Sequence, residues 1–247
     1  MRKPSIIHNL KRVLLLLAAH HRSPQTDSAL SFIFAFTAGA MNSGGFLAIG
    51  QYTSHMTGIL ASISDNLVLG ATKSALSAAI AVLVFCMGAA FSAFLINHLR
   101  RNFWGQQFAG PILLEALLIL GFGIVGVIGG GTAVSFGLSA GLLCFIMGLQ
   151  NATITKITRA RMRTTHITGI LTDIGIRIGN GQTKPNHHLS SLSVLRWVFL
   201  MFFAGGLTGA IGFSVVGYGF CLPLAAVLVL VATPPFFRSG KSRAFYG

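Results

Sequence analysis

A six-residue phrase, His-x-Thr-Gly-Ile-Leu, occurs twice in this chain and holds the residues best suited to binding chemistry. The copies begin at His55 and His166, 111 residues apart. Each histidine can donate, accept or titrate near neutral pH, and each copy adds a hydroxyl and a glycine that admits close approach. Those residues are Thr57, Gly58, Thr168 and Gly169. The pattern indicates binding of a small solute.

Hydroxyl residues in and just before each copy favour the start of a short helix. Ser54 or Thr57, and Thr165 or Thr168, are expected to cap such a helix. A helix N-terminus placed within a membrane presents unpaired N–H groups and a partial positive charge. It can therefore hold an anion or a polar solute, or repel protons and cations. The alternative is a packing motif preserved by duplication, with its histidines bonded to backbone.

Two further echoes accompany the phrase in the same order, at offsets of 109 and 117 residues. They are Phe36-x-x-Gly39-x-x-Asn42 with Phe145-x-x-Gly148-x-x-Asn151, and Phe85-x-x-Gly88 with Phe202-x-x-Gly205. Duplication of a membrane unit is common in transporters. Asn42 and Asn151 precede the repeated phrases, so their amides are expected to contact a solute or to satisfy irregular backbone.

Few acids are present, and three charged residues are candidates for proton or charge coupling. Glu115 lies inside an apolar run, where an acid is a functional candidate by default. Glu115 is also close enough to its helix end to reach the interface. Asp173 and Arg177 are four apart and are expected to form an intrahelical pair, which is their structural alternative.

These residues must be positioned by membrane helices, because the composition excludes an ordinary soluble domain. The 247 residues have a mean hydropathy of +0.75, with 53% hydrophobic and 9% charged residues. A soluble domain carries about 25% charged residues. The net charge of +14 sits in a few basic clusters without interleaved aromatics, which argues against nucleic-acid binding. The three cysteines are isolated, and no metal or cofactor site is expected.

The chain is predicted to be all-α, with six segments long enough to span a bilayer. These are about 28–50, 74–97, 110–129, 132–153, 190–214 and 217–233. Two shorter segments, about 52–71 and 164–180, carry the repeated phrase. Gly88-x-x-x-Ser92 and Gly205-x-x-x-Gly209 predict close helix packing.

Charge decides whether the short segments cross. If neither does, both termini and two basic connections lie on one side and carry sixteen of the eighteen Lys and Arg residues. The positive-inside rule then makes that side cytoplasmic. With three crossings in each repeat, the second repeat is inverted, and each short segment is re-entrant. Such backbone needs protein or a water-filled cavity around it.

Four parts of the chain follow from this arrangement. Residues 1–27 form a basic, amphipathic cytoplasmic segment, favoured over a cleaved signal peptide because His20-His21-Arg22 replaces the small cleavage residues. Membrane repeats occupy 28–130 and 131–233, and 234–247 form a basic cytoplasmic tail.

The run from Ala38 to Leu47, followed by Ser54 to Gly58, resembles the YoaK-like family of bacterial multi-pass membrane proteins. Gln150-Asn151-Ala152 and Thr168-Gly169 fit the same pattern. The family typically has Asn after Met-Thr-Gly, but this chain has Ile59, so no polar role is carried over there. The resemblance covers most of 30–233 and implies a bacterial inner-membrane protein with about six crossings. It implies no activity.

The sequence therefore favours a small-solute transporter or channel, with the lipid bilayer and a small polar or anionic solute as partners. A non-transporting scaffold or regulator is the main alternative. An intramembrane enzyme is less favoured, because no nucleophile motif, metal set or phosphate loop is present. Homo-oligomer formation is left open.

Overall fold

A computed structural model describes residues 23–103, 106–159, 164–181 and 192–233, and all regular structure in these ranges is helical. Most of the predicted amphipathic segment at 1–27 and the whole predicted tail at 234–247 lie outside the described residues. The long helices are α2 (Pro24–Ile49), α4 (Thr72–Asn102), α5 (Ala109–Ile128), α6 (Ala133–Ile157) and α8 (Leu192–Val216). The shorter elements are α3 (Met56–Val68), α7 (Ile167–Gly179), the 3-10 turn η1 (Gly217–Phe220) and α9 (Cys221–Ala232).

Helices occupy all the predicted positions, with ends that differ by a few residues. Local chemistry sets these ends. Ser23 caps α2: its hydroxyl accepts from the Thr26 N–H at 3.2 Å, and the Thr26 hydroxyl accepts from the Ser23 N–H at 2.9 Å. Asp27 lies in the first turn, where a negative charge is favourable. Gly50 ends α2 in the left-handed region, at φ 72°.

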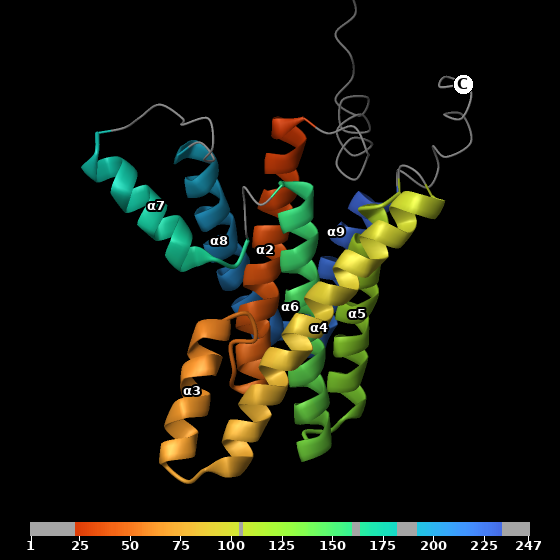
Figure 1. The fold of residues 1–247 in the computed structure, drawn as a ribbon. Helices are drawn as coiled ribbons and strands as arrows, with labels where there is room; N and C mark the ends of the chain where they lie inside the picture. Colours follow the sequence, from red (N-terminus) through yellow and green to blue (C-terminus); the bar gives the residue numbers. More distant parts are fainter. Residues whose placement is uncertain (1–22, 104–105, 160–163, 182–191, 234–247) are drawn as a thin grey trace, which may run out of the picture.

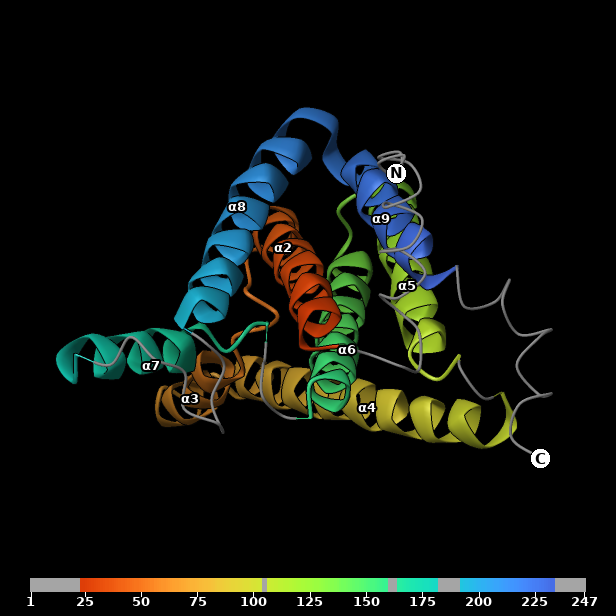
Figure 2. The same ribbon diagram turned by 90° about the horizontal axis from the view of Figure 1, so that it is seen from above.

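Within the described ranges, five stretches are long and apolar enough to cross a membrane. Four are α2, α4, α5 and α6, and the fifth is the 40-residue run Ser193–Ala232. That run turns at η1, and its second part, α9, packs against α5 (Figures 1 and 2). The chain is thus a multi-pass helical membrane protein.

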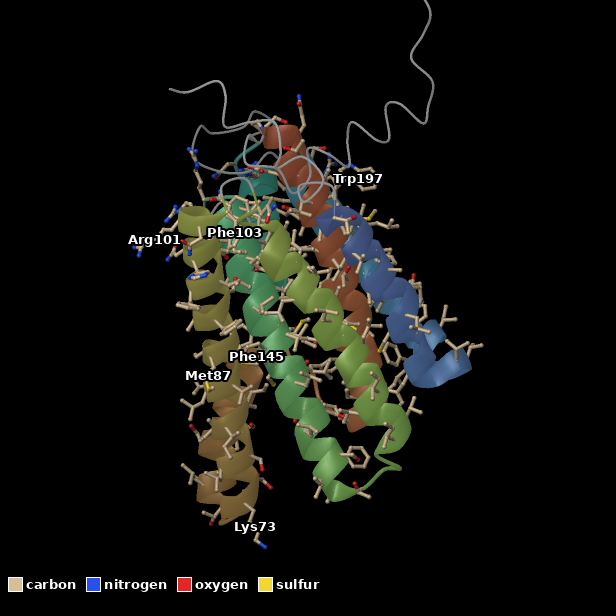
Figure 3. The ribbon with its side chains drawn as sticks, turned by 90° about the vertical axis from the view of Figure 1, so that its right-hand side faces the viewer. Lys73, Met87, Arg101, Phe103, Phe145 and Trp197 are labelled. Carbon is tan, nitrogen blue, oxygen red and sulfur yellow. The ribbon has the colours of Figure 1, made fainter. Side chains whose placement is uncertain are left out.

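The outer face of α4 matches a bilayer in length. Six apolar side chains form one exposed stripe along it: Leu76, Ile80, Leu83, Met87, Phe91 and Phe94. The stripe spans about 27 Å at 1.5 Å per residue, close to the hydrocarbon thickness of about 30 Å. Lys73 and Arg101 lie at the two ends of the helix (Figure 3). This face is therefore suited to contact lipid.

The main helix pairs join the two halves of the chain. The contacts pair α2 with α8, α4 with α6, and α5 with α9 (Figure 2). A β-carbon added to Gly39 would overlap the Phe202 carbonyl oxygen, and one added to Gly205 would overlap the Phe36 carbonyl oxygen. Each helix of the α2–α8 pair therefore places a glycine against the other helix's backbone.

The α4–α6 pair repeats this reciprocal contact. Gly88 faces the Phe145 carbonyl, and Gly148 faces the Phe85 carbonyl. One turn along, the Ser92 and Thr153 hydroxyls are hydrogen bonded at 2.9 Å. The predicted close packing of the small-residue motifs is therefore found, and it occurs between the repeats. All four Phe-x-x-Gly motifs therefore lie at the points where these two helix pairs cross.

Candidate functional site

The two copies of the repeated phrase have the same local structure. His55 is the residue before α3, with φ −93° and ψ 64°. His166 is the residue before α7, with φ −85° and ψ 56°. The carbonyl of each histidine accepts the first helical hydrogen bond, from Ile59 and Ile170, at 3.1 Å in both cases. The phrase therefore encodes a helix start, as predicted.

The capping predicted for the hydroxyl residues is wrong, and two of these residues, Ser54 and Thr165, bond elsewhere. Ser54 donates its hydroxyl to Asn42 Oδ1 at 2.9 Å, and its N–H points to the same oxygen at 3.4 Å. Thr165 donates its hydroxyl to Asn151 Oδ1 at 2.8 Å. Neither α3 nor α7 has a side-chain cap hydrogen bond. The asparagines instead fasten the connecting turns to the preceding helices.

These bonds fix the depth at which the short helices begin. Asn42 is seven residues before the end of α2, and Asn151 is six before the end of α6. At a rise of 1.5 Å per residue, each asparagine lies about 10 Å from the end of its long helix. The connecting turn therefore runs back along the long helix by about that distance before the short helix starts. In Figure 1, α3 then runs toward one end of the bundle and α7 toward the other. Both N-terminal ends lie on the same flank of the bundle (Figures 1 and 2).

The spacing of histidine and glycine, which is the same in both copies of the phrase, has a direct cause. The His55 ring lies over Gly58, and the His166 ring lies over Gly169, where any β-carbon would overlap the imidazole. Glycine three residues after the histidine is what allows the ring to lie along the first helical turn. The imidazoles are therefore held beside the unsatisfied N–H groups of the helix start.

Four polar side chains at these helix starts are exposed: His55, Thr57, His166 and Thr168. Just before them, Thr53 and Thr164 are buried, and neither hydroxyl has a hydrogen-bond partner among the described residues. A buried hydroxyl without a partner is unfavourable. Thr53 and Thr164 were missed in the sequence, although extending the repeated phrase two residues upstream would have found them.

Glu115 lies away from this flank, in the core between α5, α6 and α2. Its side chain is fully buried and does not reach an interface, which was one of its predicted roles. Gln150 donates from Nε2 to Glu115 Oε1 at 2.8 Å and to the Phe34 carbonyl at 3.2 Å. Gln150 had no predicted role, and only its position inside an apolar helix hinted at one.

Asp173 and Arg177 both lie on α7, but in the part of the chain described no ion pair joins them, contrary to the predicted pairing. Asp173 is half-buried, while Arg177 is 6% exposed and its Nη2 has no hydrogen-bond partner among these residues. The predicted site residues thus fall into three places. The Asn–Ser/Thr–His clusters share one flank, Asp173 and Arg177 lie further along α7, and Glu115 lies in the core.

Within the described ranges, no group of three or more His, Cys, Asp or Glu side chains is placed to hold a metal ion. A family model described as "Protein of unknown function (DUF1275)" matches residues 30–233. The chain belongs to this family. The match spans α2 to α9 and includes both repeated phrases and Glu115, and it is consistent with the YoaK-like resemblance. Neither the curated proteins nor the solved structures contain a match to this DUF1275 protein.

Proposed function

We propose that the protein is a small-solute transporter or channel of the bacterial inner membrane, made of two inverted repeats with three crossings each. Both termini are cytoplasmic in this arrangement. One observation carries the proposal: α3 and α7 start part-way along the bundle, on one flank and in the same conformation, and an asparagine of the preceding helix binds the turn before each of them. Paired broken helices of this kind form substrate sites in transporters.

The opposite courses of the short helices support the inverted arrangement. In Figure 1, α3 leads back to the end of the bundle that α2 has just reached, and α7 leads back to the end that α6 has reached. Re-entrant segments have this course. The six-crossing count further requires α8 and α9 to cross separately. The turn at η1 and the packing of α9 on α5 favour this.

The solute site consists of the two helix starts, with Asn42 and Asn151 as anchors. His55, Thr57, Gly58 and their counterparts His166, Thr168 and Gly169 supply donors and access. The uncapped N–H groups favour a polar or anionic solute. The orphan hydroxyls of Thr53 and Thr164 add two more groups that need a partner. The solute is therefore expected to be small and rich in hydrogen-bond acceptors.

The exposure of the same flank favours one alternative, a membrane scaffold. Polar groups at membrane depth are tolerated only beside protein or water. His55 and His166 are exposed in the single chain, so the flank faces a water-filled path or another polypeptide. A water-filled path along the flank would indicate a transporter. A polypeptide that covers the flank would indicate a scaffold or a homo-oligomer. An enzymatic role has no such observation in its favour.

The deciding experiment screens purified protein for thermal stabilisation by small anions and polar metabolites, then measures flux of any hit into liposomes. A ligand at 100 times its dissociation constant adds about 2.7 kcal/mol of stability. We expect the His55→Ala/His166→Ala variant to fold, to lose this stabilisation and to lose flux. A matched control is His98→Ala, which changes a histidine on the exposed end of α4.

Two results would reject the proposed site or function. Flux that survives in the double histidine variant would remove the site from this flank. A protein that binds no member of the panel, carries no flux and co-purifies with a stoichiometric polypeptide over this flank would establish the scaffold.

A further inference from the structure

The polar cluster in the core is incomplete in a specific way. Glu115 and Gln150 are both fully buried, and one hydrogen bond of 2.8 Å joins them. The second carboxyl oxygen, Glu115 Oε2, and the amide oxygen, Gln150 Oε1, have no hydrogen-bond partner among the described residues. Both orphans are acceptors, so the cluster lacks a donor.

The orientation of the Gln150 amide is fixed by its surroundings. Its nitrogen lies at 2.8 Å from a carboxyl oxygen and at 3.2 Å from the Phe34 carbonyl oxygen, and both of these are acceptors. Exchanging the amide nitrogen and oxygen would place the amide oxygen against the Phe34 carbonyl oxygen, and neither of these atoms can donate a hydrogen bond. The Gln150 oxygen is therefore a genuine orphan, and rotating the amide does not supply the missing donor.

An ionised Glu115 cannot satisfy this cluster, because a carboxylate only accepts hydrogen bonds. No Lys, Arg or His is hydrogen bonded or ion paired to it in the described part of the protein. The titratable group nearest in sequence to Phe34 on the same helix is Asp27, two turns away. On α6, Lys156 is exposed and follows Gln150 by six residues. An isolated carboxylate in such surroundings is costly.

We propose that Glu115 and Gln150 form a proton-binding site, with the proton on Glu115 Oε2 donated to Gln150 Oε1. The two side chains then make a cyclic acid–amide pair: Gln150 donates to the acid and the acid donates back. Each buried donor and acceptor has a partner, and Phe34 takes the second amide hydrogen. The proposal rests on this core cluster alone and is independent of the solute site.

Comparison of the repeats adds a second observation. The position equivalent to Gln150 in the first repeat, 109 residues earlier, is Met41, which is also fully buried. An apolar side chain is therefore accommodated at the equivalent position of the first repeat, so the repeated unit does not itself require glutamine there. The glutamine stands at this position in the second repeat, where its side chain is hydrogen bonded to Glu115.

Infrared spectra of the full-length protein in detergent at neutral pH test the proposal. The difference between wild type and Glu115→Gln should contain the carbonyl band of a protonated carboxylic acid, which shifts in heavy water. Gln150→Met should move that band to higher frequency by removing its hydrogen bond. Carboxylate bands in place of the acid band would overturn the proposal.

Stability of the variants provides a readout that needs no spectrum. Gln at position 115 copies the hydrogen bonds of the protonated acid, so Glu115→Gln should melt within a few degrees of wild type. A variant that fails to fold would contradict the proposal. The double variant Glu115→Leu/Gln150→Met removes both partners and serves as a second spectral reference. An acid band that persists in that variant would show that it does not arise from Glu115.

Discussion

Gly39 lies so close to the backbone carbonyl of Phe202 that no β-carbon fits between them. The same contact is made in reverse by Gly205 and the Phe36 carbonyl, and twice more between α4 and α6. Lipid tails compete equally for apolar side chains, so membrane helices associate through close packing of small residues. These four contacts, two in each helix pair, are therefore expected to hold the two repeats together.

Gly39→Ala is expected to separate α2 from α8 locally. Its methyl group meets a carbonyl and a neighbouring backbone nitrogen, which cannot rotate aside as a side chain can. Overpacking typically costs about 1–3 kcal/mol, and backbone contact places this substitution at the upper end. The melting temperature in detergent should fall by several degrees.

Gly141→Ala is the matched control, because it also lies in a long helix but has open space where the methyl would go. It should melt as wild type does, or slightly higher. Equal melting temperatures for Gly39→Ala and Gly141→Ala would show that the crossing is not tight in the membrane protein.

Gly58→Ala and Gly169→Ala should behave differently from the crossing variants. Here the methyl meets the end of an imidazole, which can swing away. Both variants should fold, while the displaced histidine weakens solute binding. Calorimetry or thermal shift with the solute found in the screen checks this. Solute binding as tight as in wild type would show that the ring positions are incidental.

The Asn42–Ser54 bond can be measured by a double-mutant cycle with Asn42→Ala, Ser54→Ala and the pair. Membrane hydrogen bonds average about 0.6 kcal/mol, with a maximum near 1.7. We expect a coupling energy in that range, measured by unfolding in mixed micelles. The parallel cycle for Asn151 and Thr165 should agree, because the bond lengths are 2.9 and 2.8 Å. A coupling of zero in both cycles would remove the anchoring role.

Cysteine labelling tests the orientation. Lys73 and Arg101 lie at opposite ends of α4 (Figure 3). In the proposed topology, Lys73→Cys reacts with a membrane-impermeant maleimide from outside intact cells, and Arg101→Cys reacts only after lysis. Cys86, which is exposed on α4, is first replaced, while Cys144 and Cys221 are buried and can stay. The reverse labelling pattern would show that the protein has the opposite orientation in the membrane.

Much of the fold follows from the sequence because its signals are local. Apolar runs and glycine placement locate the helices, and the echo of His55 at His166 predicts that two helices start alike. Gly88 and Gly205 also reveal that their helix faces pack closely. Periodicity and composition are sufficient for each of these features.

Partner choice was harder to predict because it depends on the three-dimensional arrangement. Nothing local shows that Gly39 meets Phe202 rather than a nearer helix. Ser54 and Thr165 have good capping chemistry, but a nearby asparagine accepts their hydroxyls instead. The hydrogen bond between Glu115 and Gln150 likewise depends on how α5 and α6 are aligned along their length.

Pairing across the repeats has a consequence for biosynthesis. The contact partner of Gly39 is Phe202, which lies 163 residues later in the chain, so the ribosome reaches it on the order of 10–30 s after Gly39. During that interval the face of α2 that carries Gly39 lacks its partner, α8. The first repeat therefore cannot complete its packing until the second repeat has been synthesised.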